Sequence, residues 1–396
     1  MHNQNPVFIP GPTNMPDVIR KACDIATLDH RSTAFGQIFG PAVAAVKKIL
    51  GTAEGEVFIF PSTGTGGWEA AISNTLSPGD TVLAARFGMF SHRWIDMCLR
   101  HRLNVQVIET PWGEGAPLKQ IEQALRADRG HMIKAVLVTH NETATGVRSD
   151  IAGVRRALTQ AGHPALLMVD GVSSIASMEF RMDAWAVDIA VTGSQKGFML
   201  PAGLAILGVS QKALAAMETA ALPRTFFDFR DMRKSYAAGG YPYTPAVGLM
   251  NGLNLSCRLL LEEGLERVWA RHHRIAEGVR RAVAGWGLRP CAVSPDLYSD
   301  TVTAVVVPEG CNGTDLVKLA AEKYDMAFGV GLGEVAGKVF RIGHLGSLTD
   351  AMMLSGLAVA EMCMADLGWK VTLGSGVAAA QDYYRTSATL STKAAA

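Results

Sequence analysis

Seven short apolar runs recur along the first half of the chain, and segments with helical spacing separate most of them. The runs are EVFIF from residue 56, TVLAA from 81, NVQVIE from 104, KAVLVTH from 134, ALLMVD from 165, DIAVTG from 188 and GLAILGV from 203. Apolar strands that alternate with amphipathic helices are typical of a mostly parallel sheet covered on both faces. The sequence therefore predicts an α/β fold.

The pattern changes after about residue 245, where a long helical stretch is followed by the shorter strand candidates TVTAVVV and KVFRIGH. Leu249, Leu253, Leu260 and Leu261 have the spacing of a core stripe on a helix. We therefore predict a large domain followed by a smaller α+β domain. The expected divisions are an N-terminal arm at 1–25, the large domain at 26–264, the small domain at 265–380 and a frayed C-terminal tail at 381–396.

Composition narrows the kind of partner. The 396 residues are 48% hydrophobic and 18% charged, and 37 Lys and Arg nearly balance 36 Asp and Glu. Such a charge balance gives no basic field for nucleic acid or a membrane surface, so small molecules are the expected partners.

The first residues lack the pattern of a secretory leader, and we expect a cytoplasmic protein. The six cysteines form no C-x-x-C pair, which favours reduced core thiols over disulfides or a metal site.

Ligands of such sheets bind beyond the carboxyl ends of the strands, so the residues that follow each apolar run are candidates. The run EVFIF leads into PSTGTGGWEAA, a glycine-rich turn that opens a helix. Free backbone N–H groups and the helix dipole suit a phosphate at such a turn. The turn is neither a Walker loop nor G-x-G-x-x-G, because Glu69 stands where the last glycine belongs. Alone, it is equally consistent with a tight turn that needs glycine for backbone freedom.

Two charged residues follow neighbouring runs. Asp170 ends ALLMVD and Lys196 follows DIAVTGSQ. Taken singly, the first is an ordinary turn cap and the second an exposed lysine. Taken with the glycine turn, they supply the three anchors that pyridoxal 5′-phosphate needs, for its phosphate, its ring nitrogen and its aldehyde. Asp170 would keep the ring nitrogen protonated, while Lys196 would form a Schiff base and carry a proton between the substrate Cα and the cofactor. That proton transfer is the central step of transamination.

Several motifs carry a family resemblance. STGTGGWEAA, VDGVSS, GSQKGFMLPAG and GLGEVAGKVFRIGHLG occur in the order found in class V aminotransferases of fold type I, the alanine:glyoxylate and serine:glyoxylate family. DHRS, FGMFSHRWIDM and HNETATGV resemble most closely the bacterial serine:glyoxylate group, which includes an aspartate:glyoxylate aminotransferase of the β-hydroxyaspartate cycle. The resemblance covers nearly the whole chain. It implies a homodimer with active sites shared between subunits.

The resemblance assigns roles to single residues. For the phosphate it implies Thr65, Gly66, Gly67 and Gln195, together with Tyr241 and Thr244 from the neighbouring subunit. Phe90 is expected to lie over the cofactor ring, where alanine:glyoxylate enzymes have a tryptophan. Thr143 is expected near the ring oxygen. Each of these side chains also has an ordinary explanation as core packing or a turn cap.

The substrate site rests on the same resemblance. Arg341, after an apolar strand, is the expected anchor for the α-carboxylate, since its planar fork gives two parallel hydrogen bonds. Gly11 is expected beside it. Arg31 and His344, with His30 as a further candidate, are expected to read the donor side chain, although each residue type is more often structural.

The expected activity is pyridoxal-phosphate-dependent transfer of an amino group from L-serine or L-aspartate to glyoxylate, giving glycine by a ping-pong mechanism. Alternatives are an alanine:glyoxylate aminotransferase and a cysteine desulfurase-like lyase, which typically has His before the lysine where this chain has Gln195. A non-catalytic module that binds the cofactor or a nucleotide is a third reading. It would need no combination of Asp170, Lys196 and Arg341.

Overall fold

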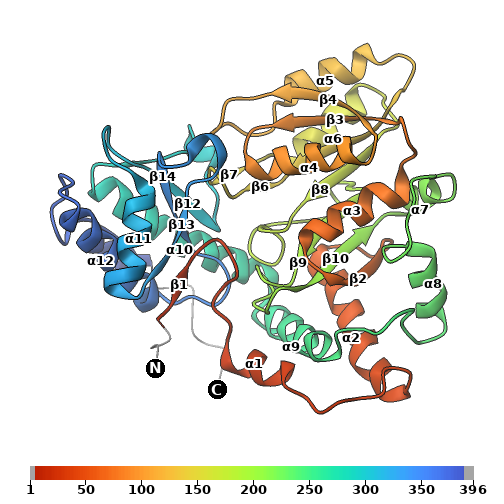
Figure 1. Cartoon of the computed structure of the whole chain (residues 1–396), viewed down its shortest axis with the longest axis horizontal. Coiled ribbons are helices and arrows are strands. Elements are labelled where there is room, and N and C mark those ends of the chain that lie inside the picture. The colour runs from red at the N-terminus through yellow and green to blue at the C-terminus, as the bar shows by residue number, and fades with distance from the viewer. Residues whose placement is uncertain (1–4, 388–396) are drawn as a thin grey trace.

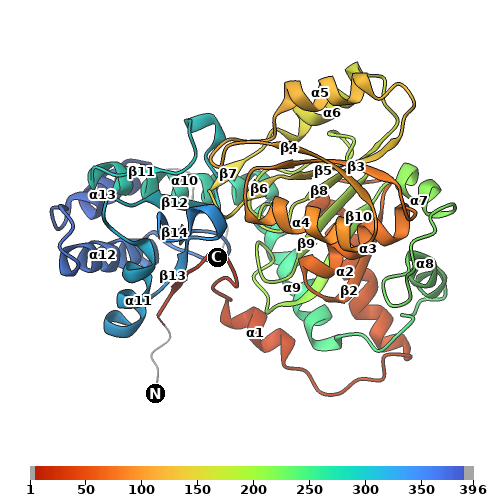
Figure 2. The same ribbon diagram turned by 45° about the horizontal axis from the view of Figure 1, so that its top comes forward.

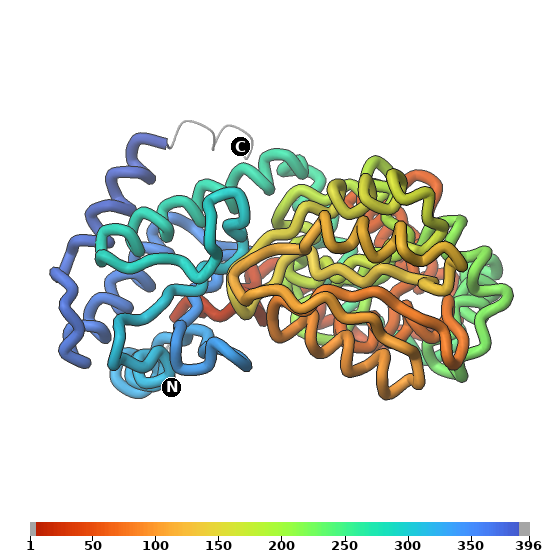
Figure 3. Tube along the Cα trace, turned by 90° about the horizontal axis from the view of Figure 1, so that it is seen from above, coloured from red at the N-terminus to blue at the C-terminus, as the bar shows by residue number. Residues whose placement is uncertain are grey.

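The computed structural model describes residues 5–387, which form two lobes, each built around its own sheet (Figures 1 and 3). The first lobe has a continuous apolar core that extends from Ile19 to Val268. The second has a separate core that contains Phe8 and the residues from Ile275 onward. Residues 1–4 of the predicted arm and 388–396 of the predicted tail lie outside the described residues.

The first lobe contains a sheet of seven strands. In spatial order these are β2 (Glu56–Ser62), β10 (Gly203–Val209), β9 (Ile189–Gly193), β8 (Leu166–Asp170), β5 (Ile133–Thr139), β3 (Thr81–Arg86) and β4 (Asn104–Glu109). Each of the seven predicted apolar runs is one of these strands. All are parallel except β10, which is antiparallel to both of its neighbours. The α/β prediction is therefore confirmed, with one reversed strand.

Helices cover both faces of this sheet, as buried apolar strands require. Helices α3 (Gly64–Thr75) and α4 (Met89–Arg100) pack side by side on one face, and α5 (Leu118–Ala127) and α6 (Ile151–Gln160) lie on the other (Figure 2). The remaining elements of this lobe are α1 (Asp17–Cys23), α2 (Thr33–Leu50), α7 (Gln211–Met217), α8 (Phe229–Ala237), α9 (Val247–Glu263) and the hairpin β6 (Asn141–Glu142) and β7 (Val147–Arg148). Helix α9 packs between α1 and α2.

The second lobe has five strands in the order β1 (Val7–Phe8), β13 (Ala327–Val330), β14 (Val339–Gly343), β12 (Val302–Val306) and β11 (Arg289–Pro290). Apart from the parallel pair β1–β13, these strands are antiparallel. Its helices are α10 (Leu265–Gly285), α11 (Gly313–Tyr324), α12 (Asp350–Asp366) and α13 (Ser375–Ser387), and two short 3₁₀ turns occupy Pro295–Leu297 and Gly333–Val335.

Three features differ from the divisions expected from sequence. Part of the predicted arm is a strand, because Val7–Phe8 pair with β13 and Phe8 enters the second core. The change from one core to the other falls within α10, between Val268 and Ile275, and not at its first residue. The predicted start of a frayed tail at residue 381 is wrong for the residues up to 387. Helix α13 continues to Ser387 because Tyr384 is buried and its hydroxyl donates to the Ile275 carbonyl at 2.8 Å.

The six cysteines carry free thiols, as their scattered spacing indicates. Within residues 5–387, no helix combines the length and the apolar character that spanning a bilayer would require.

Candidate active site

Two neighbouring strands of the first sheet bring the predicted acid and amine together. Asp170 is the last residue of β8, and Lys196 lies in the turn that follows β9. These strands are parallel partners, with Asp170 opposite Val191, so both side chains stand at the same edge of the sheet. The negative charge of Asp170 acts to raise the pKa of the Lys196 amine, although other effects lower it overall. The structure therefore brings these two residues to the same edge of the sheet.

Lys196 is surrounded by the N-terminal segment that follows β1. Its Nζ donates to the carbonyl oxygen of Pro10, and its own carbonyl accepts from Thr13 Oγ1 at 3.1 Å. A Cβ atom at Gly11 would lie against the lysine side chain, and Gly11 has a φ of 116°, so glycine suits this close approach. Burial, assisted by the charge of Arg341, lowers the pKa of the lysine to about 8. A larger fraction of this amine than of an exposed lysine is therefore neutral and nucleophilic near neutral pH.

Asp170 is a buried carboxylate with few partners. Only 4% of it is exposed, and its Oδ1 accepts the Val172 N–H at 3.0 Å. Burial raises its pKa to about 7, and the nearby charge of Glu142 adds to this rise, while the Val172 hydrogen bond and Lys196 oppose it. A buried carboxylate of this kind favours a cationic partner, such as a protonated ring nitrogen, because a cation would lower its pKa again.

The glycine-rich turn lies beside these two residues. Gly64, the first residue of α3, packs directly against Val172, and a Cβ at Gly67 would press on Val191 of β9. The N-cap residue Thr63 makes no side-chain hydrogen bond to the helix. Among residues 5–387, the N–H groups of residues 64–66 have no hydrogen-bond acceptor. This helix start is therefore free to hold an anion.

Two further observations fit a bound cofactor at this edge of the sheet. A Cβ at Gly66 would overlap Ser62 Oγ and lie 2.8 Å from Phe227, so only glycine leaves the cradle open. The Gln195 Oε1 atom is buried and has no hydrogen-bond partner among the described residues. A buried polar atom without a hydrogen-bond partner destabilises the folded protein unless a ligand or water supplies the partner. The cradle, the carboxylate and the amine together match the phosphate, ring nitrogen and aldehyde of pyridoxal 5′-phosphate.

Arg341 comes to the site from the other lobe. It lies on β14 and is 7% exposed, and its guanidinium donates to the Val330 carbonyl at 2.7 Å and the Thr143 carbonyl at 3.0 Å. Among residues 5–387, no carboxylate forms an ion pair with it. Burial lowers its pKa to about 10, so it stays cationic at neutral pH. A buried arginine that lacks an anionic partner is a suitable receptor for a substrate carboxylate.

Phe90 and Thr143 are joined by a residue that sequence reasoning missed. Phe90 is half-buried at the start of α4, and Thr143 lies in the turn of the β6–β7 hairpin. Between them stands the fully buried Glu142, whose carboxylate accepts the Phe90 N–H at 3.0 Å. The sequence did offer a signal, because HNE directly follows an apolar strand.

Three predicted residues are not gathered at this edge of the sheet. His344 is fully buried, and its ring nitrogens contact Thr303 Oγ1 at 2.9 Å and the Asp300 carbonyl at 3.2 Å. In this chain both of its ring nitrogens therefore already have partners. The Tyr241 hydroxyl donates to the Ile59 carbonyl at 2.6 Å within its own chain. Arg31 is exposed, with its backbone N–H on Asp29 Oδ1.

The remaining predicted positions are compatible with their roles. Thr65 and Thr244 are exposed, and Gln195 is half-buried beside the lysine. His30 is half-buried, and its Nε2 has no partner among residues 5–387.

The arrangement defines an enzyme that uses pyridoxal 5′-phosphate: a lysine of lowered pKa, a buried acid behind it and an anion cradle at a helix start. Its reaction class follows from the family. The family model described as aminotransferase class V matches residues 20–337, and the chain belongs to that family.

Individual relatives are similar along the whole chain. The chain is 68% identical to the L-aspartate–glyoxylate aminotransferase of Paracoccus denitrificans (strain Pd 1222) over 396 residues, which is 100% of both chains. It is 54% identical to the serine–glyoxylate aminotransferase of Methylorubrum extorquens over 387 residues, 96% of each. The crystal structure of pyridoxamine-pyruvate aminotransferase from Mesorhizobium loti has 30% identity and a TM-score of 0.90, covering 97% of this chain and 98% of that one. The predicted fold type is confirmed by this match.

Proposed function

We propose that this enzyme transfers the amino group of an L-amino acid to glyoxylate and so forms glycine. The observation that carries the proposal is Arg341, a buried cation that forms no ion pair with a carboxylate of residues 5–387 and that acts electrostatically on the amine of Lys196. An α-carboxylate on this guanidinium would place its neighbouring carbon toward the lysine, and glyoxylate offers little beyond that carboxylate and a carbonyl. The similarity to two glyoxylate aminotransferases supports the same acceptor.

The residues divide the work of the reaction. Pyridoxal 5′-phosphate, when bound, accepts the electrons of the broken Cα–H bond. Lys196 would take the proton from the substrate Cα and deliver it to the cofactor carbon that carried the aldehyde, a transfer that its lowered pKa allows. Asp170 would keep a proton on the ring nitrogen of the cofactor. Arg341 holds the substrate carboxylate so that the Cα–H bond is correctly oriented.

We propose L-aspartate as the preferred donor, with L-serine as the second candidate. The relative named for L-aspartate is 68% identical to this chain, and the one named for serine is 54% identical. The direct experiment compares kcat/KM for L-aspartate, L-serine and L-alanine at a fixed glyoxylate concentration. A protein that forms no glycine with any of the three contradicts the proposed function, and one that favours L-serine contradicts only the choice of donor.

Arg341→Lys should raise KM for glyoxylate and for the amino donor by about 10- to 100-fold, with a smaller change in kcat. Lysine keeps the charge but loses the planar fork and its two parallel hydrogen bonds. Steady-state kinetics with each substrate varied in turn would measure the effect. The matched control is Arg100→Lys, an exposed arginine at the end of α4, which should leave both KM values unchanged. Equal KM values for Arg341→Lys and wild type would remove Arg341 from the substrate site.

Arg31→Ala should lower kcat/KM for L-aspartate by about tenfold and for L-serine by less than twofold, if Arg31 binds the second carboxylate of the donor. Within its own chain Arg31 is exposed, so this role requires the subunit arrangement that the family resemblance implies. Parallel assays with the two donors measure the ratio. A common decrease for both donors would show that Arg31 does not read the side chain.

We also propose a cytoplasmic homodimer. The exposed position of Thr244 supports a role for that residue in a neighbouring subunit, whereas Tyr241 is held in its own core. We propose further that the two lobes are the large and small domains of the chain, which their separate apolar cores support.

A further inference from the structure

Glu142 is the one fully buried carboxylate at the site that transamination does not directly require. It ends β6 and has no exposed surface. Both of its oxygens accept hydrogen bonds from backbone N–H groups: Oε1 from Ala144 at 3.1 Å, and Oε2 from Phe90 and Ser91, each at 3.0 Å. Among residues 5–387 it forms no ion pair. Burial raises the pKa of this carboxyl, and the hydrogen bonds from Ser91, Ala144 and Phe90 oppose that rise. A carboxyl whose two oxygens act only as acceptors has the bonding pattern of the ionised form.

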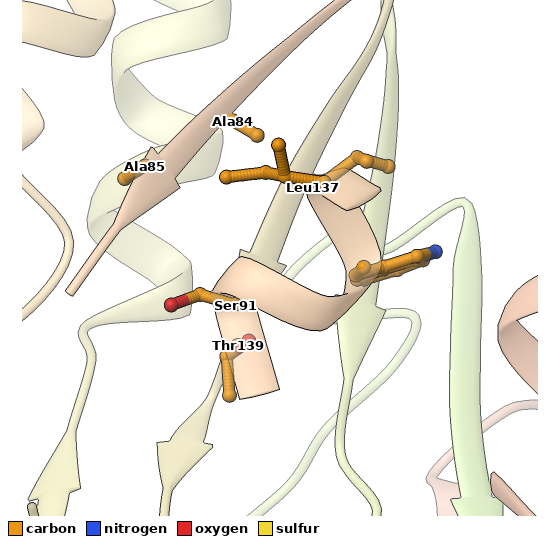
Figure 4. A pocket seen from close by; sticks show the side chains of 7 residues that line it. Ala84, Ala85, Ser91, Leu137 and Thr139 are labelled. Carbon is orange, nitrogen blue, oxygen red and sulfur yellow. The ribbon is translucent and has the colours of Figure 1, made fainter. Parts of the chain in front are cut away.

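Its first set of contacts fixes the start of α4. The first N–H groups of a helix have no partner within the helix, and Glu142 satisfies those of Phe90 and Ser91. A Cβ at Gly88 would overlap the Glu142 carboxylate carbon, so Gly88 leaves the room for this approach. Behind this turn, the gap lined by Ser91, Thr139 and Leu137 has no room for a water molecule (Figure 4). Glu142 therefore supplies the acceptors that the first N–H groups of α4 need.

Its other contact fixes the hairpin turn. The Oε1 bond to Ala144 N closes a turn over Thr143, the residue between them. The carbonyl of Thr143 accepts the Arg341 Nη1 donor at 3.0 Å. The orientation of that carbonyl, and with it the guanidinium, depends on the turn that Glu142 closes. The negative charge also raises the pKa of Arg341, against the effect of burial, without occupying any guanidinium N–H group.

We propose that Glu142 is a positioning residue that sets the substrate-binding guanidinium of Arg341 and the cofactor-facing ring of Phe90 in one fixed relation. The same carboxylate holds the backbone that presents each of them. A direct ion pair with Arg341 would compete with the substrate, and the contact through Thr143 avoids that competition. The substrate half of this inference rests on the proposed function.

Glu142→Gln tests the proposal, since glutamine keeps the shape but loses one acceptor and the charge. We expect KM for glyoxylate and donor to rise about tenfold, and the dissociation constant of pyridoxal 5′-phosphate, titrated into the cofactor-free protein, to rise several-fold, with kcat changed less. Asp150→Asn is the matched control. Asp150 also caps a helix, α6, through Gly153 N at 2.7 Å, but on the opposite face of the sheet. This control should leave both constants unchanged.

A second variant and a measurement on the wild-type protein test the proposal if Glu142→Gln does not fold. Gly88→Ala should displace the carboxylate while keeping its charge, and should reproduce both changes. In the wild-type protein, hydrogen exchange should show the amides of Phe90, Ser91 and Ala144 protected. Constants within twofold of wild type in the folded variants, or rapid exchange of those amides, would overturn the inference. An inactive wild type would count against the proposed function alone, because cofactor binding and exchange need no substrate and still decide the inference.

Discussion

Lys196→Ala should reduce glyoxylate-dependent transamination by about 10³-fold and abolish covalent attachment of the cofactor. A primary amine is needed to form the Schiff base, and burial lowers the pKa of this one to about 8, which prepares it for both bond formation and proton transfer. Neither Pro10 nor Thr13, which contact the lysine, carries a group that would replace it.

Mass spectrometry after borohydride reduction tests attachment separately from activity. The wild-type chain should gain the mass of the reduced cofactor on Lys196, and the variant should gain none. Lys119→Ala, at an exposed position in α5, is the control and should behave as wild type. A variant at position 196 that retains attachment or more than about one tenth of the activity would contradict the catalytic assignment.

Asp170→Asn should lower kcat by about 10²- to 10³-fold while leaving Lys196 able to attach the cofactor. Asparagine can still accept the Val172 N–H, so the local fold is retained, but it provides no charge for a protonated ring nitrogen. Single-turnover measurements of the first half-reaction, with the amino donor alone, would report the effect on proton transfer.

Asp183→Asn is the appropriate control for that experiment. Asp183 is an exposed carboxylate that also accepts a backbone N–H, from Ala53 at 2.7 Å, and it lies outside the site. Its replacement should leave kcat unchanged. If Asp170→Asn retained wild-type kcat, the buried acid would not serve the ring nitrogen.

The strands were predictable from the sequence because a strand buried on both faces appears as a continuous apolar run. All seven runs are strands of the first sheet. Direction is not encoded in such runs, so the reversal of β10 was not apparent. The strand Val7–Phe8 was missed because two residues give no periodic signal, and only pairing with β13 makes them a strand.

The chemistry at the strand ends was predictable for the same reason. Asp170 and Lys196 each follow an apolar run, and neighbouring parallel strands bring such residues to one edge. A motif match does not show which groups a side chain already bonds within its own chain, as His344 and Tyr241 do here. Glu142 escaped notice because a buried carboxylate that bonds only to backbone has no partner residue to reveal it.

The hydrogen-bonded segment at the N-terminus has a mechanical consequence. Phe8 is aligned with Phe328 in β13, and Gly329, the next residue, is aligned with Arg341 in β14. Two residues after Phe8, the Pro10 oxygen accepts the Lys196 amine. A displacement of the second sheet would therefore be transmitted through this two-residue strand to the backbone that lies against Lys196. The substrate-binding arginine and the lysine are thus mechanically connected through the first residues of the chain.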